Sequence, residues 1–321
     1  MRPFRFTAQV PDIGGPRRGW TARLGRIEAL GFDTVALADH FTGGYQAEPF
    51  VVLSAAAAAT GLRVQTAVLG VDYRHPVLVH RMAATLDVLS EGRVELGLGA
   101  GWMRSDYDAA GLAYDPPGQR IERLEETIAI VKGLFAGGPL TFHGRHYRVD
   151  ELVGVPAAVQ RPHPPLLIGG GGRRMLRLAG READIVGLNA NLARGDTGGH
   201  SVLDVSWESM AEKVAWVREG AVAAGRDPDT LELSMAQWLL FVNESRSATD
   251  SLVEKMAARV GVEPRWLEAS PGVVVGSAAR CVDKLEELRA RLGITNVQVH
   301  AGPRAVDVEP LAPVLATLAG R

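Results

Sequence analysis

Cysteine is almost absent from this sequence, since Cys281 is the only one in 321 residues. A single cysteine excludes a disulfide within the chain and any metal cluster that several cysteines would hold. Low cysteine use also fits a reducing compartment, and we expect a cytoplasmic protein. The first residues enter an apolar stretch at once, without the central region of a secretory signal peptide.

Long apolar runs and an excess of charge are also missing. No apolar run approaches the ~20 residues that a membrane-spanning helix needs. The 35 Lys and Arg residues nearly balance the 37 Asp and Glu residues, which leaves a net charge of −2 without a basic stripe. We therefore expect neither a membrane nor a nucleic acid as a partner.

Several catalytic motifs are not found. The sequence has no Gly-x-Ser-x-Gly elbow and no plausible cysteine nucleophile, which disfavours hydrolysis through a covalent intermediate. It has no His-x-x-x-His pair and no Cys/His cluster, so we expect no metal centre. The glycine-rich stretches lack the Gly-Lys-Ser/Thr ending of a Walker A loop.

The sequence does contain a clear strand, helix and strand unit over Gly61–Trp102. The apolar run Val64–Leu69 predicts a strand, and Pro76 suits the first position of a helix. Val94–Leu98 predicts a second, parallel strand. The helix presents one apolar face, made by Leu78, Met82, Leu86 and Leu89.

Glycines occupy alternate positions where this second strand ends, namely Gly97, Gly99 and Gly101. Their spacing is not that of the dinucleotide fingerprint. Small residues here could relieve crowding inside a barrel or allow a bulge. Equally, a bare backbone could let a flat ring approach the strand end. The spacing alone leaves both interpretations open.

Strands and helices alternate about eight times along the chain, which predicts a (β/α)8 TIM barrel formed as a single domain over residues 1–321. We expect Leu231–Val242 and Val273–Val275 among its strands. The alternation is interrupted at about 136–165 by an insertion that contains a small hairpin and a proline-rich connector. An open doubly wound sheet is disfavoured, because the first strand lacks a glycine-rich phosphate turn.

Polar residues follow several predicted strands and would converge at the carboxyl-terminal mouth of a barrel. Asp39 and His40 follow the second strand, and they could form an acid/base pair, a metal-ligand pair or a simple helix-entry turn. Adjacent strand residues point to opposite faces, so both aim inward only if the strand has ended. His75 could line the mouth or cap the helix that comes after it.

A run of four glycines precedes a predicted helix and Arg173. Free backbone N–H groups at a helix N-terminus favour an anion, and the arginine adds positive charge. The alternative is a loose connection with surface arginines. We favour a phosphate site, formed by Gly169, Gly170, Gly171, Gly172 and Arg173.

The chain resembles the luciferase-like monooxygenase superfamily, and within it the branch that uses the deazaflavin coenzyme F420. The matching stretches span nearly the whole chain in the family's order: ALADHF at 36–41, TAVLGVDYRHP at 66–76, GRVELGLGAGW at 92–102, QRIERLEETIAIVKGLF at 119–135, HPPLLIGGGG at 163–172, READIVGLN at 181–189 and GSAARCVDKLEELRARLGITNVQV at 276–299.

This resemblance implies a flavin-type ring across the barrel mouth and a phosphate in the Gly169–Gly172 loop. Asp39 and His40 would lie near the reactive edge of the ring as the catalytic residues. The resemblance also implies a cis peptide bond between Ala67 and Val68, in a bulge that supports the ring. The remaining cofactor contacts would come from Gly99, Gly101, Trp102 and Arg173.

The resemblance indicates the class of chemistry better than the substrate. Sugar-phosphate dehydrogenases of this branch carry a Glu where this chain has Trp102. We expect hydride transfer with coenzyme F420; the alternatives are an FMN-dependent monooxygenase and a non-catalytic barrel that binds the cofactor. Aromatic residues near the mouth favour a partly hydrophobic small organic substrate: Phe41, Tyr45, Tyr73 and Trp102. The resemblance also implies a homodimer.

Overall fold

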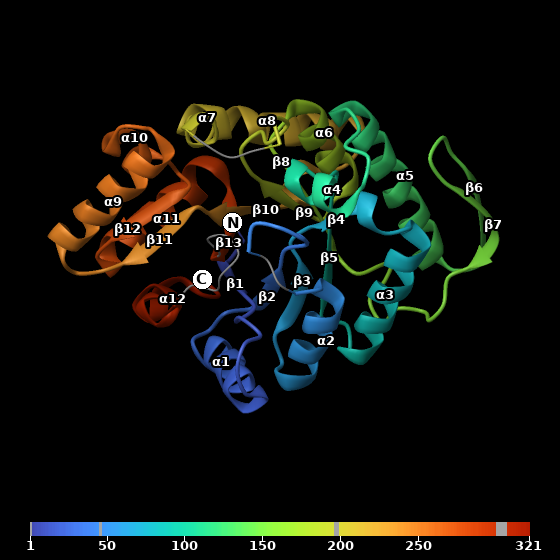
Figure 1. The fold of residues 1–321 in the computed structure, drawn as a ribbon, viewed down its shortest axis with the longest axis horizontal. Helices are drawn as coiled ribbons and strands as arrows, with labels where there is room; N and C mark the ends of the chain where they lie inside the picture. The colour runs from blue at the N-terminus through green and yellow to red at the C-terminus, as the bar shows by residue number, and fades with distance from the viewer. Residues whose placement is uncertain (1, 45–46, 196–198, 300–306) are drawn as a thin grey trace.

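A computed structural model describes residues 2–44, 47–195, 199–299 and 307–321 (Figure 1). Tyr45 lies outside these residues. The described chain forms a closed barrel of eight parallel strands, which confirms the predicted fold class. Each strand pairs with its neighbours in parallel, and pairing of the third with the fourth closes the ring. In chain order the barrel strands are β1 (Arg5–Gln9), β2 (Thr34–Leu37), β3 (Arg63–Thr66), β5 (Val94–Gly99), β8 (Leu166–Gly170), β9 (Ile185–Leu188), β10 (Glu232–Gln237) and β13 (Ile294–Val299).

Helices follow the strands and surround the barrel (Figure 1). Local sequence explains their starts: Pro49 and Pro76 begin two of them, and His75 caps the second through Nδ1, which accepts the Val77 N–H at 3.3 Å. His75 therefore has the helix-capping role. The larger helices are α1 (Arg17–Ala29), α2 (Pro49–Ala59), α3 (Pro76–Leu89), α5 (Pro117–Ala136), α6 (Arg173–Glu182), α8 (Trp207–Ala223) and α11 (Ala278–Leu292).

Short elements join these units at the two ends of the barrel. They are β4 (Leu69–Gly70), η1 (Val71–Tyr73), α4 (Arg104–Ala110), α7 (Gly199–Leu203), η2 (Pro228–Thr230), η3 (Glu309–Leu311) and α12 (Ala312–Leu318). No helix in the described part of the chain combines the length and the apolar character that a bilayer crossing requires.

Two segments depart from the barrel, at opposite edges of the view in Figure 1. The first is the predicted insertion, which forms an antiparallel hairpin of β6 (Pro139–His143) and β7 (Arg148–Val153). The second was not predicted. Instead of one strand over Leu231–Val242, the chain forms β10 and then β11 (Leu239–Val242). The latter pairs outside the barrel with β12 (Val273–Gly276), beside α9 (Arg246–Val260) and α10 (Pro264–Ala269).

The expectation that Val273–Val275 is a barrel strand is therefore wrong. Leu239–Val242 and Val273–Gly276 are both strands, but they pair with each other. They form a separate two-stranded sheet with its own cluster of buried side chains. Periodicity identifies a strand without identifying its partner, because the same apolar pattern suits any buried sheet.

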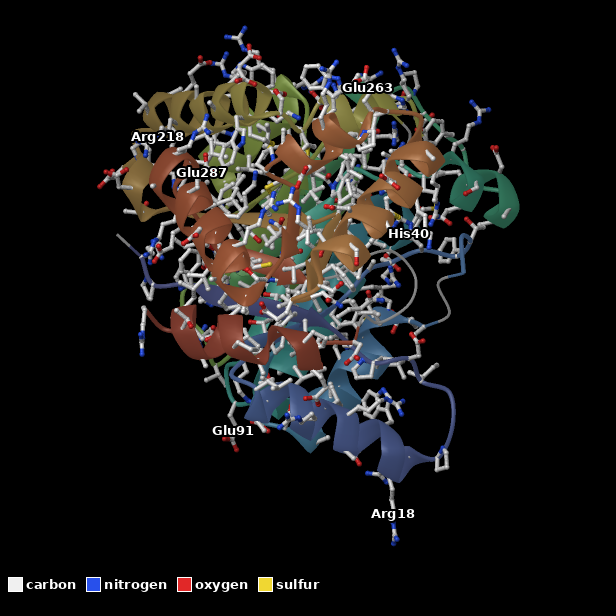
Figure 2. The ribbon with its side chains drawn as sticks, turned by 90° about the vertical axis from the view of Figure 1, so that its left-hand side faces the viewer. Arg18, His40, Glu91, Arg218, Glu263 and Glu287 are labelled. Carbon is white, nitrogen blue, oxygen red and sulfur yellow. The ribbon has the colours of Figure 1, made fainter. Side chains whose placement is uncertain are left out.

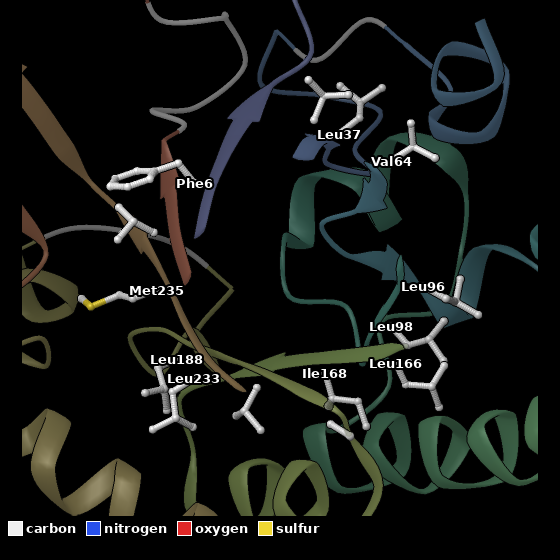
Figure 3. Packing of buried hydrophobic residues seen from close by; sticks show 14 of the residues in the cluster. Phe6, Leu37, Val64, Leu96, Leu98, Leu166, Ile168, Leu188, Leu233 and Met235 are labelled. Atoms are coloured by element: carbon white, nitrogen blue, oxygen red, sulfur yellow. The ribbon is translucent and has the colours of Figure 1, made fainter. Parts of the chain in front are cut away.

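The main apolar core lies between the strands and the helices. Figure 3 shows such side chains on most of the barrel strands, among them Phe6, Val64, Leu96, Ile168 and Met235. These side chains alternate with residues that face the barrel interior. Burial of this continuous layer is the main stabilising contribution to the fold.

The barrel interior is polar toward its amino end. Arg5 forms ion pairs with Glu95 at 2.5 Å and Glu232 at 2.8 Å. Gln65 donates to Glu95 at 2.6 Å and accepts from Gln298 at 3.2 Å. Gln65 and Gln298 belong to strands that are not neighbours, so they meet across the interior. Most TIM barrels fill this space with branched apolar side chains.

Candidate active site

His40 lies just beyond the carboxyl end of β2, where strand-end residues converge. Its Nδ1 is 2.6 Å from Oδ2 of Asp106, which belongs to the first turn of α4. The His40 side chain keeps 13% of its surface exposed, whereas the Asp106 side chain is fully buried. Figure 2 shows His40 on the side of the molecule opposite Glu91, which precedes β5 at the amino end of the barrel. The structure therefore brings together two residues that are 66 positions apart.

The Asp106 carboxylate is held by several donors. Its Oδ1 accepts the backbone N–H groups of Phe41 at 3.1 Å and Thr42 at 2.9 Å. The Thr42 hydroxyl donates to the same oxygen at 2.7 Å. Burial alone would raise the pKa of Asp106, but the hydrogen bonds from Thr42 and His40 outweigh it and lower this pKa. Asp106 is therefore an ionised acceptor that faces Nδ1 of His40.

Asp39 faces a different partner from its neighbour His40. Its carboxylate receives two N–H groups of Arg74, at 2.5 and 3.1 Å, and the backbone N–H of Gly70 at 3.2 Å. The same guanidinium also reaches Glu48 at 2.9 Å. The expectation that adjacent residues point apart thus describes this pair well. Asp39 joins the end of β2 to the segment after β3, and His40 joins it to α4.

The segment after β3 explains two of the alternating glycines. The Ala67–Val68 peptide bond is cis, as the family resemblance predicted. A Cβ added to Gly99 would come within 2.5 Å of a Val68 methyl group, and one added to Gly97 would overlap the Thr66 carbonyl oxygen. These glycines make room for the neighbouring chain, which favours the crowding interpretation.

Gly101 has a conformational reason of its own. Its φ is +73°, in the left-handed region that favours glycine, and the Tyr107 hydroxyl fills the space where a side chain would lie. The next residue, Trp102, is half-buried. Its ring meets the His40 ring edge-on, with the two ring centroids 5.6 Å apart. The end of β5 therefore places an aromatic side chain beside His40.

An apolar, half-exposed strip lies at the ends of the neighbouring strands. Ala67 and Val68 from the segment after β3, Ala100 after β5 and Gly169 of β8 all retain partial exposure. Val68 lies beside Gly169, since a Cβ there would be 3.6 Å from a Val68 methyl group. Such a surface of backbone and small apolar side chains suits the face of a planar ring.

The four-glycine run leads into α6, but its members have different surroundings. Added side-chain atoms would collide with Met175 at Gly170 and with the Ala190 carbonyl at Gly171, whereas Gly172 has only ordinary contacts with Asn191. Among the described residues, no side chain caps the first N–H groups of α6. Those N–H groups are the anion-binding feature of this loop.

The two arginines after the glycine run do not converge on the loop. Arg173 pairs with Glu219 of α8 at 3.3 Å, and Arg174 pairs with Glu125 of α5 at 3.4 Å. Both guanidinium groups are about half exposed and belong to the contacts between helices. For the arginines, the interpretation as surface residues is favoured.

Two other cationic side chains near the mouth, Arg123 and Arg74, are matched by carboxylates. Arg123 lies 2.5 Å from both Asp72 and Asp115, and the Tyr107 hydroxyl donates to Asp72 at 2.8 Å. Arg74 is neutralised in the same way by its two acidic partners. Within the described ranges, no group of three His, Cys, Asp or Glu side chains is placed to hold a metal ion.

Asp106 is the site residue that reading the sequence missed. Asp106 stood in an apparently ordinary acidic loop, Ser105–Asp108, and its exposed neighbour Asp108 has the same chemistry. A helical reading of 104–110 would have placed one acid inward. It would not have identified His40 as the partner, because that contact depends on how the barrel closes.

Known proteins resemble this chain in sequence over about half to three fifths of its length. It is 30% identical to an FMNH2-dependent dimethylsulfone monooxygenase of Pseudomonas putida over 60% of this chain and 58% of that protein. It is 35% identical to an F420-dependent glucose-6-phosphate dehydrogenase of Microbacterium testaceum over 49% of this chain and 48% of that one. The chain thus spans about half to three fifths of the length of these relatives.

A solved structure shares the fold. The coenzyme F420 dependent tetrahydromethanopterin reductase of Methanopyrus kandleri superposes with a TM-score of 0.75 at 21% identity, over 98% of this chain and 97% of that one. The model of the luciferase-like monooxygenase family matches residues 6–296. This match covers nearly the whole barrel, and the chain therefore belongs to the luciferase-like monooxygenase family.

Proposed function

We propose that this protein is an oxidoreductase that uses coenzyme F420 to transfer a hydride to or from a small, uncharged organic substrate. The observation that carries the proposal is the position of His40. It is held by a buried carboxylate at the carboxyl end of the barrel, the end that also carries the half-exposed strip of Ala67, Val68 and Gly169. A proton-exchanging group next to a surface for a planar ring is the arrangement that hydride chemistry on an alcohol or carbonyl needs.

The residues present fit a deazaflavin. Its ring would lie on the apolar strip at the ends of β3, β5 and β8, flanked by Trp102 and His40. Its phosphate would meet the uncapped N–H groups after Gly172. When bound, the cofactor supplies a carbon centre that accepts or donates the hydride. The protein's own part is to orient the ring and to hold a proton at His40 Nε2.

The mouth favours an uncharged substrate. Arg74 and Arg123, two arginines on the His40 side, are each engaged by two carboxylates. A phosphate or carboxylate on the substrate would compete with these pairs at a desolvation cost. The Phe41 side chain is 48% exposed, and its ring lies tilted against the Tyr73 ring with the two ring centroids 4.6 Å apart. Phe41 therefore offers the substrate an apolar contact instead.

A second candidate is an FMN-dependent monooxygenase on the same barrel. The similarity to the Pseudomonas putida enzyme favours it, because that FMNH2-dependent relative is 30% identical over 60% of this chain. The apolar strip would accept either ring. The two functions differ in the fate of the reduced ring, since only a monooxygenase consumes oxygen.

Titration with both cofactors tests the proposal. Purified protein is titrated with F420 and with FMN, oxidised and reduced, and binding is followed by fluorescence. We expect F420 to bind at least tenfold more tightly than FMN, a difference of ~1.4 kcal/mol in binding free energy.

Turnover of a panel of neutral alcohols and ketones should proceed equally with and without oxygen. Preferential FMN binding with oxygen-dependent product would replace the proposal by the second candidate. Binding without any turnover would favour a non-catalytic barrel.

His40→Ala separates a proton-transfer role from a binding role. We expect turnover to fall by about 10²-fold with little change in F420 affinity, because general acid–base groups contribute that much. Arg18→Ala, an exposed change in α1, is the control. A variant that turns over at the original rate would contradict the assignment of His40.

A further inference from the structure

We infer that Asp106 is a positioning residue for His40. It accepts the Nδ1–H of the imidazole and so makes Nε2 the ring atom at which His40 exchanges a proton. The tautomer is set by the geometry of the protein alone. Its use in a reaction rests on the proposed function.

The two oxygens of this carboxylate have separate tasks. Oδ1 takes three donors from Phe41 and Thr42, which immediately follow His40 in the chain. Oδ2 faces His40 Nδ1 at 2.6 Å, with the Tyr73 hydroxyl at 3.4 Å. Because Oδ1 is fixed by the backbone next to His40, Oδ2 is held at a set position relative to the imidazole. The Asp106 carboxylate is thus bound to residues 41 and 42, which directly follow the histidine that it orients.

A buried, ionised acceptor determines which nitrogen of a neutral imidazole carries the hydrogen. A carboxylate cannot donate, so Nδ1 must be the protonated nitrogen and Nε2 the basic one. The same contact stabilises the imidazolium that forms when Nε2 takes a proton. Among the other titratable groups that the structure describes, Tyr73 bonds to Asp106, whereas Asp39, which precedes His40, is turned toward Arg74.

A purely structural role for Asp106 predicts different behaviour. If it only anchored α4 to the end of β2, an amide would serve nearly as well, because its oxygen could keep the bonds to Phe41 and Thr42. The NH2 group would then replace Oδ2 opposite His40 and would donate to Nδ1. The Asp106→Asn variant therefore keeps the anchor and reverses the preferred tautomer.

Nitrogen-15 NMR of histidine-labelled, full-length protein measures the tautomer directly, with His40→Gln used to assign the signal. We expect the Nδ1–H form in the original protein and the Nε2–H form in Asp106→Asn. Asp106→Glu restores a carboxylate and should recover the Nδ1–H form. Asp108→Asn is the matched control, since Asp108 is exposed on the same short helix and pairs only with Arg104 among the described contacts.

Turnover with F420 supplies the second measurement. We expect Asp106→Asn to lower kcat by at least tenfold while F420 affinity stays within about twofold, and Asp106→Glu to recover part of the loss. An unchanged tautomer in Asp106→Asn, with thermal unfolding like that of Asp108→Asn, would overturn the inference. The NMR result does not depend on the cofactor, so failure of the proposed function alone would leave the tautomer reversal intact.

Discussion

At the scale of single residues, the glycines of this barrel have distinct physical reasons. Gly99 is required because Val68 occupies the space above it, whereas Gly169 on the next strand meets the same valine at ordinary contact distance. Gly101 is required by its backbone angle. Gly99 and Gly101 belong to one short motif, but a substitution would disturb side-chain packing at Gly99 and the backbone angle at Gly101. The motif alone does not reveal this difference.

Replacing Gly99 with alanine should destabilise the protein. The new Cβ would lie 2.5 Å from a Val68 methyl group, and a β-branched side chain has little freedom to move away. We expect a loss of about 1–3 kcal/mol in the free energy of unfolding, typical of overpacking, measured by urea denaturation. Gly169→Ala is the matched control and should change stability by less than ~1 kcal/mol. Equal stability of the two variants would contradict this account of Gly99.

At the scale of elements, one carboxylate of α5 binds the backbone at the tip of the inserted hairpin. Glu126 of α5 accepts the backbone N–H groups of Arg145 at 2.7 Å, His146 at 3.0 Å and Tyr147 at 3.0 Å. Apolar side chains of the hairpin, including Val149, pack on the same helix. The hairpin tip thus depends on a single side chain for the hydrogen bonds of its turn.

Glu126→Ala should loosen this tip without unfolding the barrel. Hydrogen bonds to a charged group contribute about 1.5–3 kcal/mol each when buried, and less at a half-exposed turn such as this one. We expect amide hydrogen exchange at residues 145–147 to accelerate at least tenfold, while the barrel strands keep their protection. Glu122→Ala is the control, because the contacts described between Glu122 and the tip are with side chains and not with backbone N–H groups. Unchanged exchange in Glu126→Ala would show that apolar packing alone holds the hairpin.

The elements also show how much of the fold could be predicted from the sequence. Apolar periodicity and helix-start prolines located the barrel strands and the insertion, because these signals are local. These signals could not assign Leu239–Val242 and Val273–Gly276 to a second sheet, since strand pairing is decided by chain geometry. The same limit applies to the site: His40 and the glycine loops were found through motifs, but the buried contact with Asp106 joins segments that are distant in sequence.

At the scale of the whole molecule, a closed barrel leaves its outer helices to meet other molecules. Helices α2 and α3 are neighbours (Figure 1). Each carries an exposed aliphatic side chain in its first turn. Val51 of α2 is 70% exposed and Leu78 of α3 is 53% exposed. Exposed apolar side chains on adjacent helices are typical of a protein–protein contact. Together with the homodimer implied by the family resemblance, they make this face the expected contact between two copies.

We predict that the protein is a homodimer in solution and that Val51→Glu with Leu78→Glu makes it monomeric. A symmetric interface would repeat each substitution on both copies and bring like charges together in a desolvated contact. Sedimentation velocity at micromolar concentration measures the assembly, with circular dichroism to confirm the fold. Val222→Glu is the matched control, because Val222 is 64% exposed on α8, away from this face, and should leave the dimer intact. A monomeric original protein would contradict the dimer itself. A dimer that survives the double substitution would show that two copies meet through another surface.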